Sequence, residues 1–238
     1  MCTLVVAAHV VPDRPLVVVA NRDEQLDRKS SPPFRWREPS AGDQGFFAPR
    51  DEVAGGTWLG VNEHGVFVGI TNRFLGPRDA TRASRGELVV QALGLSSARA
   101  IHDAMRAVDP ARYNGFHLLY ADERDVLVTF ADGATLAQVA LGKGRHAITE
   151  RSFGAGDDRK RLARIDAAWN PKNLEKLLTE HDEADPLAAT CVHYPPYNYG
   201  TRSAMVLERT HEMGGARWRM RWAEGPPCVT PFRDTLVA

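Results

Sequence analysis

Residues 1–24 consist of MCTLVVAAHVV (1–11), PDRP (12–15) and LVVVANRDE (16–24). Residues 3–10 and 15–20 are two nearly continuous apolar runs rich in Val, and the PDRP turn separates them. Such runs are typical of strands that are buried on both faces, so we predict a hairpin whose first strand begins at Cys2.

The pattern continues outward from this hairpin. Residues 31–56, rich in Pro and Gly, predict a long loop with a short strand at Phe46-Phe47. The Asn62-to-Gly65 turn predicts a second hairpin of strands 57–61 and 66–72. The remaining expected elements are helices within Ser84–Val108, strands at 115–121, 125–131, 135–141 and 145–149, helices at 157–169 and from Asn170-Pro171 to His181, and strands near 189–193, 200–209, 216–223 and 227–232.

Strands and helices therefore alternate in blocks, and hairpins dominate the β blocks. This order excludes the regular βαβ alternation of a doubly wound sheet. Two antiparallel sheets packed face to face, with helices on both outer sides, account for it. We predict an α+β fold, a four-layer αββα sandwich, in a single domain spanning residues 1–238.

Composition limits the partners. The 238 residues contain 30 basic and 30 acidic side chains, so no net field favours nucleic acid or an anionic membrane. No apolar run reaches the roughly 18 residues of a membrane span. Three cysteines, an odd number, fit a reducing compartment better than a disulfide framework, so we expect a cytoplasmic protein. Neither the cysteines nor the eight histidines show metal-ligand spacing, and no metal site is predicted.

Two local basic clusters interrupt this balance. Arg159-Lys160-Arg161, with Arg164, is interpreted as a solvated helix face. The arginines between Arg217 and Arg221 alternate with apolar residues, which predicts the outer face of a strand.

Cys2 is the strongest candidate for chemistry. Methionine aminopeptidase normally removes Met1 before a residue as small as Cys, and the mature chain would then carry a thiol and a free α-amine on one residue. The thiol is a good nucleophile as thiolate, and the α-amine, with an ordinary pKa of about 7.7–8.0, suits a general base. The alternative is a small buried residue at the start of a strand.

Residues at strand ends could complete such a site. Asn21-Arg22-Asp23-Glu24 ends the strand that returns beside Cys2, where a guanidinium would lower the thiol pKa and a carboxylate would orient the amine. The alternative is a polar cluster that simply leaves the strand. Asn72 ends a later strand, where its carboxamide could serve in an oxyanion hole or simply form a turn. Arg202 is a cation within a predicted strand, with an edge position as the simpler explanation.

These residues resemble those of a known family. Met1-Cys2-Thr3, Asn21-Arg22-Asp23-Glu24, Gly56-Thr57-Trp58-Leu59-Gly60, Asn62 with Gly65, Thr71-Asn72-Arg73, Arg85-Gly86-Glu87-Leu88, Tyr113-Asn114-Gly115-Phe116 and Tyr199-Gly200-Thr201-Arg202-Ser203 resemble the NRDE-motif proteins, the Transport and Golgi organisation protein 2 family. That family is similar in plan to the N-terminal-nucleophile (Ntn) hydrolases of the choloylglycine hydrolase and penicillin V acylase group.

The resemblance implies the αββα fold, Cys2 as nucleophile and its α-amine as base. It further implies that Arg22 polarises the thiolate, that Asp23 binds the amine, that Asn72 contributes to the oxyanion hole and that Arg202 lies at the far side of the pocket. Because Arg22 and Asp23 are adjacent, their side chains should point to opposite faces if the strand continues, which sets these two assignments against each other.

Two functions follow as hypotheses. The first is a hydrolase that cleaves the C–N amide bond of a small acylated substrate through a thioester at Cys2, with no cofactor. The second is a non-catalytic carrier of haem or an acyl lipid, in which Cys2, Cys191 or a histidine such as His193 supplies an axial ligand. A scaffold or trafficking role without ligand chemistry remains a third reading.

Overall fold

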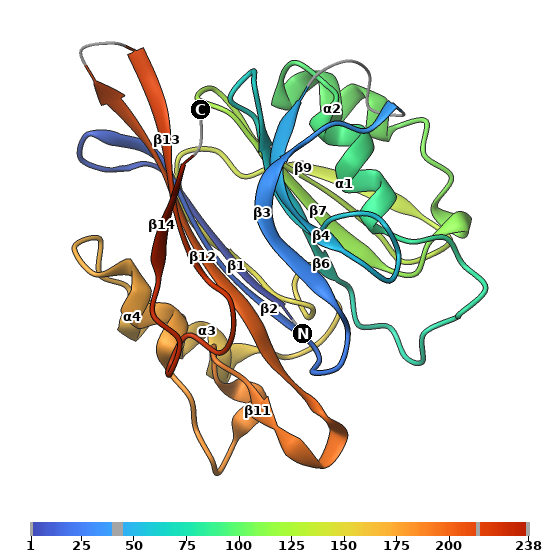
Figure 1. Cartoon of the computed structure of the whole chain (residues 1–238). Coiled ribbons are helices and arrows are strands. Elements are labelled where there is room, and N and C mark those ends of the chain that lie inside the picture. Colours follow the sequence, from blue (N-terminus) through green and yellow to red (C-terminus); the bar gives the residue numbers. More distant parts are fainter. Residues whose placement is uncertain (1, 40–44, 213–214, 237–238) are drawn as a thin grey trace. The chain divides into compact units, whose positions relative to one another are not determined.

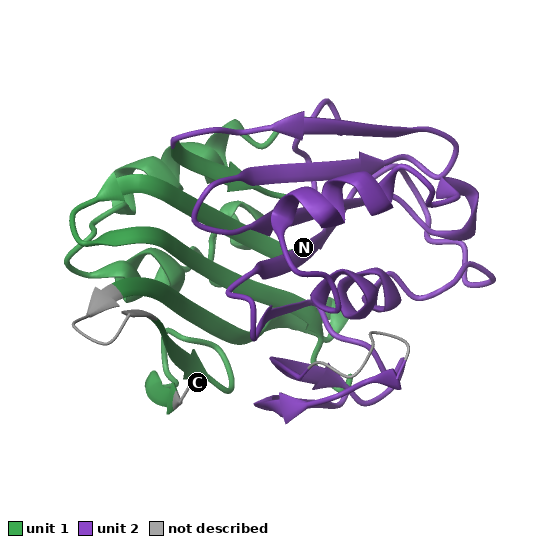
Figure 2. Ribbon diagram, turned by 90° about the horizontal axis from the view of Figure 1, so that it is seen from above, with its two compact units in different colours: residues 1–28, 144–149, 156–238 green, residues 29–143, 150–155 purple. Residues whose placement is uncertain are grey.

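The computed structural model describes residues 2–39, 45–212 and 215–236. Contacts divide the chain into two compact units, which Figure 2 shows in different colours. Unit 1 comprises residues 1–28, 144–149 and 156–238, and unit 2 comprises residues 29–143 and 150–155. Unit 1 is therefore assembled from segments at both ends of the chain, whereas most of unit 2 is one continuous segment.

Unit 1 is built on a seven-stranded antiparallel sheet (Figure 1). Its strands, in spatial order, are β10 (Gly144–Ile148), β1 (Cys2–Val11), β2 (Arg14–Gln25), β12 (Tyr199–Glu212), β13 (Gly215–Ala223) and β14 (Arg233–Leu236), and β11 (His193–Tyr194) pairs with one end of β12. The β1–β2 hairpin is confirmed, and its apolar residues are buried on both faces.

Two helices, α3 (Arg159–Ala168) and α4 (Leu174–Thr179), cover one face of this sheet. The apolar core between these helices and the sheet contains alternate residues of the strands. From β1 and β2 it includes Val5, Val17 and Val19, with Ile165 of α3 and Leu177 of α4. The odd-numbered residues of β1 and β2 therefore face the helices.

Unit 2 contains a second seven-stranded antiparallel sheet, in which every strand is adjacent to its neighbour in sequence. The strands are β3 (Ser30–Trp36), β4 (Phe46–Asp51), β5 (Leu59–Asn62), β6 (Phe67–Asn72), β7 (Phe116–Ala121), β8 (Val126–Ala131) and β9 (Leu136–Ala140). Helices α1 (Gly86–Leu93) and α2 (Ala98–Met105) pack on it around a core that includes Leu88, Leu93, Ile101, Phe116 and Leu118.

Asn62 closes the β5–β6 hairpin and also fixes α1 to the sheet. Its Oδ1 accepts hydrogen bonds from the backbone N–H groups of His64 (3.1 Å) and Val66 (3.0 Å). Its Nδ2 donates to the carbonyls of Leu93 (2.9 Å) and Leu95 (2.7 Å) at the end of the helix. One carboxamide thus satisfies backbone groups of two elements, which explains an Asn at this turn.

Several sequence predictions are wrong in detail. The segment 31–56 is not a long loop, because it contains β3 and β4; Pro32 and Pro33 are tolerated because β3 is the edge strand of its sheet. Asn170-Pro171 does not start a helix: Asn170 accepts a turn hydrogen bond from the Lys172 N–H, and α4 begins at Leu174.

Of the predicted strand at 189–193, only His193 lies in a strand, the two-residue β11. The predicted strand at 227–232 is a turn, closed by hydrogen bonds to the Pro226 carbonyl, and the strand lies further on, at β14. Among the described residues, no helix has both the length and the apolar character needed to cross a membrane.

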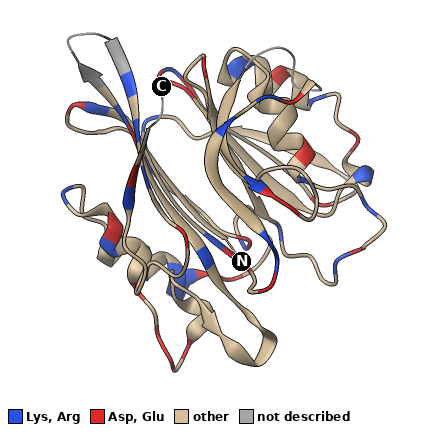
Figure 3. Ribbon diagram, viewed as in Figure 1, with Lys and Arg blue, Asp and Glu red and all other residues tan. Residues whose placement is uncertain are grey.

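Charged residues of both signs occur side by side in both units (Figure 3). The arginines of β13 follow the predicted pattern, since Arg217 and Arg219 are exposed and Arg219 pairs with Asp234 at 3.1 Å. The prediction for Arg159-Lys160-Arg161 is wrong for its last residue. Arg159 and Lys160 are exposed, whereas Arg161 is completely buried beneath α3.

Candidate functional site

Cys2 and Arg22 lie directly opposite each other in the β1–β2 pair. Directly paired residues share a face of the sheet, and even-numbered residues here point away from α3 and α4. The Arg22 side chain is buried and that of Cys2 is half-buried. The hairpin thus holds a guanidinium beside the candidate nucleophile on the face that carries no helices.

The groups around the Cys2 thiol shift its pKa in opposite directions. Burial raises the pKa of the thiol above its usual value, and the negative charge of Asp23 raises it further. A hydrogen bond from the Asp23 backbone and the positive charge of Arg22 lower that pKa, but burial outweighs them. The thiol is therefore protonated at neutral pH in this state, and a base is needed to make it a nucleophile.

Asp23 lies on the opposite face from Arg22, as the alternation along a strand requires. Its Oδ1 accepts a 2.5 Å hydrogen bond from the Thr201 hydroxyl of β12. Its Oδ2 lies 3.8 Å from Nη1 of Arg161 and has no hydrogen-bond partner among the described residues. Burial raises the pKa of Asp23, whereas Arg161 and the Thr201 hydrogen bond lower it.

Arg161 reaches this face from α3 and is held by several groups. Its Nη1 donates to the Thr3 hydroxyl at 3.1 Å, and its Nη2 donates to the Leu187 carbonyl at 2.5 Å. A buried guanidinium is stable only when it is paired and hydrogen-bonded, and Asp23 supplies the compensating charge. The two residues thus form one buried electrostatic unit below the start of β1.

A β-bulge in β12 decides which of its residues meets Asp23. Thr201 pairs with Asp23 and Ser203 pairs with Arg22, so Arg202 is the extra residue. If the register of Ser203 and Ala204 continued without the bulge, Arg202 would stand opposite Asp23. Instead its side chain is half-buried and its Nη1 donates to the Leu26 carbonyl. The structure therefore joins Cys2, Arg22 and Asp23, and directs Arg202 to the chain beyond β2.

The other two residues of the NRDE motif have structural contacts. Asn21 donates from Nδ2 to the carbonyls of Leu178 (3.0 Å) and Thr190 (2.7 Å), which ties β2 to the end of α4. Glu24 lies 3.9 Å from Arg22 and 3.8 Å from Arg28 through its Oε2. The motif thus combines one anchor to the helical layer, two residues near Cys2 and a carboxylate that balances Arg22.

Thr201 and Arg161 were not predicted as site residues. Thr201 lies in the Tyr199–Ser203 motif beside the charged Arg202, and the bulge that places Thr201 opposite Asp23 leaves no signal in the local sequence. Arg161 does have a signal: it precedes Ile165 and Ala168 at helical spacing on the buried face of α3. A cation in an apolar stripe indicates a buried partner.

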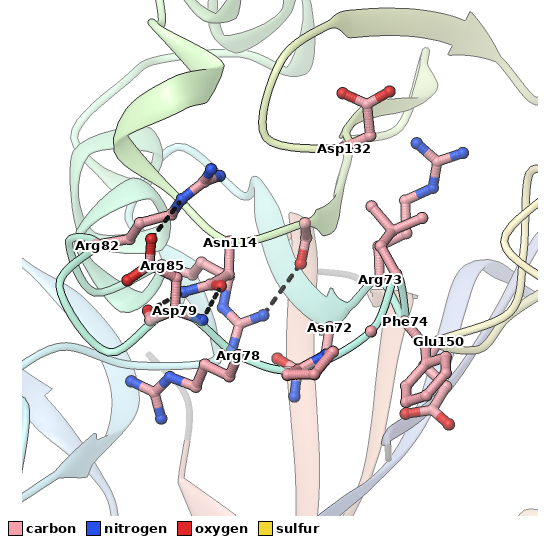
Figure 4. A pocket seen from close by; sticks show the side chains of 14 residues that line it. Asn72, Arg73, Phe74, Arg78, Asp79, Arg82, Arg85, Asn114, Asp132 and Glu150 are labelled. Atoms are coloured by element: carbon pink, nitrogen blue, oxygen red, sulfur yellow. Dashed lines mark hydrogen bonds and ion pairs between the residues drawn. The ribbon is translucent and has the colours of Figure 1, made fainter.

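Asn72 belongs to unit 2, where it ends β6 opposite Phe116 of β7. It is half-buried and lines a cavity of about 340 Å³ (Figure 4). The segment that follows β6 forms one wall, with Arg73, Phe74 and Arg78, and Asn114 is hydrogen-bonded to Asp79 of the same segment. The predicted strand end is confirmed, and an oxyanion role for Asn72 stays a prediction.

The cavity walls carry four arginines: Arg73, Arg78, Arg82 and Arg85. The first donates from Nη2 to the Phe153 carbonyl at 2.9 Å, and the last donates from Nη1 to the Gly115 carbonyl at 3.0 Å. The three carboxylates on the wall also have local contacts. Asp79 accepts a hydrogen bond from the Thr81 N–H, Glu150 lies 3.7 Å from Arg151, and Asp132 accepts N–H groups of its own turn, which lowers its pKa to about 2. The cavity wall is therefore polar and carries charges of both signs.

Solved structures identify the class of fold. An N-acylethanolamine-hydrolyzing acid amidase ortholog from Caenorhabditis elegans is similar, with a TM-score of 0.56 and 11% identity, covering 87% of this chain and 92% of that one. A conjugated bile acid hydrolase variant from Clostridium perfringens gives a TM-score of 0.51 and 10% identity, covering 100% and 97%. The protein has an Ntn-hydrolase-like fold, as predicted.

The family follows from the sequence. The model of the Transport and Golgi organisation 2 family matches residues 1–156, and the chain belongs to that family, which confirms the predicted resemblance. Transport and Golgi organization protein 2 homologs of Bos taurus and Mus musculus are 29% and 30% identical over 139 residues. These matches cover 56% of this chain and 50% of each relative, so they span about half the length of the curated relatives.

Proposed function

We propose that this protein is a hydrolase that uses Cys2 as its nucleophile to cleave the C–N bond of a small acylated amine. The observation that carries the proposal is the placement of Cys2 opposite Arg22 at the start of β1, with the Asp23 backbone hydrogen-bonded to the thiol. A cysteine that served only in packing would not need these neighbours. The proposal requires that Cys2 is the first residue of the mature chain.

In the proposed reaction, the α-amine of Cys2 takes the thiol proton as the sulfur attacks the acyl carbon. The C–N bond of the substrate then breaks, the α-ammonium returns the proton to the leaving amine, and an acyl thioester remains on Cys2. Water attacks the thioester, and the same amine accepts a proton from that water. The acid is released and the thiol is restored, so no cofactor is required.

Arg22 and Asp23 have separate tasks in this proposal, which resolves the conflict between their opposite orientations. Arg22 shares the face of the sulfur and stabilises the thiolate by its charge. Asp23 approaches from the helix-covered face, where its Oδ2 has no hydrogen-bond partner among the described residues and can accept one from the α-ammonium. Asn72 as oxyanion donor and Arg202 at the far side of the pocket remain predictions.

The test compares three proteins: the chain with Met1 removed, the same chain with Met1 retained, and Cys2→Ala. Intact mass spectrometry first establishes the state of Met1. Each protein is then incubated with a panel of N-acyl amines, and released amine and acyl-enzyme mass are measured. We expect turnover and an acyl adduct only when Cys2 is the first residue, with Cys2→Ala inactive but within about 1–2 kcal/mol of the native stability.

Equal turnover by Cys2→Ala would exclude Cys2 as nucleophile. Absence of both turnover and adduct in the Met1-free chain would exclude the hydrolase proposal for this panel. A haem titration of the same samples then addresses the carrier hypothesis, because a haem carrier with a Cys2 axial ligand shows a Soret shift that Cys2→Ala removes.

A further inference from the structure

Two cysteines and two histidines that are scattered in sequence meet in unit 1. His181 follows α4, and Cys228 lies in the turn after β13. His193 is the first residue of β11, and Cys191 lies two residues before it. The thiolate and imidazole groups of such a set are ligands that bind zinc tightly. Cys2 is not part of this set, which is separate from the proposed catalytic reaction.

The donor atoms converge on a small volume. Donor atoms of His181, His193 and Cys228 all lie within 4.8 Å of one another. Nε2 of His193 lies 3.1 Å from Cys228 Sγ and 3.4 Å from Cys191 Sγ. With bonds of about 2.3 Å to sulfur and about 2.0–2.1 Å to nitrogen, two ligands on a tetrahedral zinc ion are separated by about 3.5 Å. The observed spacings are close to that value.

Hydrogen bonding alone does not explain this arrangement. Nε2 carries either one hydrogen or one lone pair, yet it faces two sulfur atoms. The second imidazole, His181, lies edge-to-face against His193, with ring centroids 5.4 Å apart. A cation bound by His181, His193 and Cys228 would satisfy these three donors at once, and the Cys191 sulfur beside His193 is the candidate for the fourth ligand.

The backbone around the cluster is fixed by hydrogen bonds. The Cys191 N–H donates to the Glu180 carbonyl at 2.8 Å, which holds His181 near Cys191. Both Val229 and Thr230 donate to the Pro226 carbonyl, which shapes the turn that presents Cys228. Cys191 is buried, Cys228 and His193 are half-buried, and His181 is exposed, so an ion could enter from the His181 side.

We infer that Cys191, Cys228, His193 and His181 form a tetrahedral zinc site. Binding of Zn²⁺ replaces the two thiol protons, which are released to solvent, and uses the neutral form of each imidazole. Metal binding therefore needs no oxidant or reductant.

The site would also hold Asp23 in place. Val192, between Cys191 and His193, donates its N–H to Thr201 Oγ1 at 2.8 Å, and that hydroxyl donates to Asp23. A metal that fixes residues 191–193 thus fixes the hydrogen-bond partner of Asp23. The role of the metal is structural, and it acts on Asp23 through Val192 and Thr201.

The experiment uses the full chain, stripped of metal and reduced with a non-thiol reductant. Co²⁺ is titrated in, because cobalt in a tetrahedral thiolate site gives a thiolate-to-metal charge-transfer band and intense visible bands. We expect one equivalent of Co²⁺ to bind, and the cobalt bands to be displaced by one equivalent of Zn²⁺. Cys228→Ser should lose about half of the charge-transfer intensity, and Cys191→Ser with Cys228→Ser should lose all of it.

Cys2→Ala and His64→Ala are matched controls, since one removes the third cysteine and the other an exposed histidine of unit 2. Both should bind cobalt as the native chain does. Absence of the charge-transfer band in the reduced native chain, or an unchanged band in the double cysteine variant, would overturn the inference. Metal binding is measured without turnover, so failure of the hydrolase proposal leaves this test unaffected.

Discussion

Arg161 Nη1 and Asp23 Oδ2 lie 3.8 Å apart, and neither side chain has any exposed surface. At this distance the two groups interact mainly as charges, because a charge-assisted hydrogen bond would be about 2.7–2.9 Å long. Thr3, Leu187 and Thr201 provide the shorter contacts that hold the pair. A buried charge pair of this kind makes unfolding sensitive to loss of either partner.

Replacing the buried arginine should be costly. Arg161→Met leaves Asp23 buried without a compensating cation, and we expect the free energy of unfolding to fall by about 3–5 kcal/mol in urea titrations at pH 7. Arg159→Met, a change at an exposed neighbour, should alter it by less than about 0.5 kcal/mol. The cost should shrink as the pH is lowered, because Asp23 then becomes neutral; a pH-independent cost would argue against the charge pair.

Thr201 should support both stability and activity. Thr201→Val keeps the shape but removes the donor to Asp23 and the acceptor of the Val192 N–H. We expect a loss of about 1–3 kcal/mol and lower turnover, with recovery in Thr201→Ser, which retains the hydroxyl. Thr210→Val, on the same strand, serves as the control and should change stability by less than about 0.5 kcal/mol. Full stability of Thr201→Val would contradict this role.

His117 should make unit 2 sensitive to acid. The ring is fully buried, its Nδ1 lies 3.1 Å from the Thr71 hydroxyl, and its Nε2 lies 3.1 Å from the Ser152 carbonyl. Burial lowers the pKa of His117 from 6.5 to about 4. Between these values the unfolded chain binds a proton that the folded chain does not, so stability is lost as the pH falls.

The measurement is the unfolding free energy of the native chain and of His117→Gln from pH 7 to pH 4. The native chain should lose up to about 3 kcal/mol more than the variant over this range, since one pKa unit corresponds to about 1.36 kcal/mol. His64→Gln, at an exposed histidine, should follow the native curve. Parallel curves for the native chain and His117→Gln would show that this histidine titrates normally.

Gly56 should not tolerate a side chain. A Cβ there would lie 2.8 Å from the Gly86 carbonyl carbon, so the segment between β4 and β5 approaches the start of α1 backbone to backbone. We expect Gly56→Ala to lower the melting temperature by an amount equivalent to about 1–3 kcal/mol. Gly55→Ala meets no atom within 4 Å but has φ +78°, so its cost should be about 1–2 kcal/mol and come from the backbone alone. A harmless Gly56→Ala would mean that α1 shifts freely.

Short-range signals predicted much of the fold. The hairpins at 3–20 and 57–72 and the strands of β7 to β10 follow from apolar runs separated by Gly, Asp and Asn turns, and all are present. The Pro-rich edge strand β3 was missed because propensity opposes it and only its neighbour in the sheet stabilises it.

The candidate site could be predicted in part. Cys2, Arg22 and Asp23 share a hairpin, so local pairing places them together, and alternation predicts their faces. Thr201, Arg161 and the Cys191–Cys228 cluster depend on contacts between segments far apart in sequence. The spacing of residues within one segment does not predict such contacts. In addition, a bulge of one residue places Thr201, and not Arg202, opposite Asp23.

The assembly of unit 1 from distant segments has a consequence during synthesis. Asp23 and Thr201 are 178 residues apart, so β2 emerges from the ribosome long before β12 can pair with it. The continuous part of unit 2, residues 29–143, can fold in the meantime, since each of its strands pairs with a sequence neighbour. The surroundings of Cys2 are thus completed among the last events of biogenesis. Until then the apolar β1–β2 hairpin lacks its partner strand β12, and such exposed apolar strands are the kind of segment that chaperones bind.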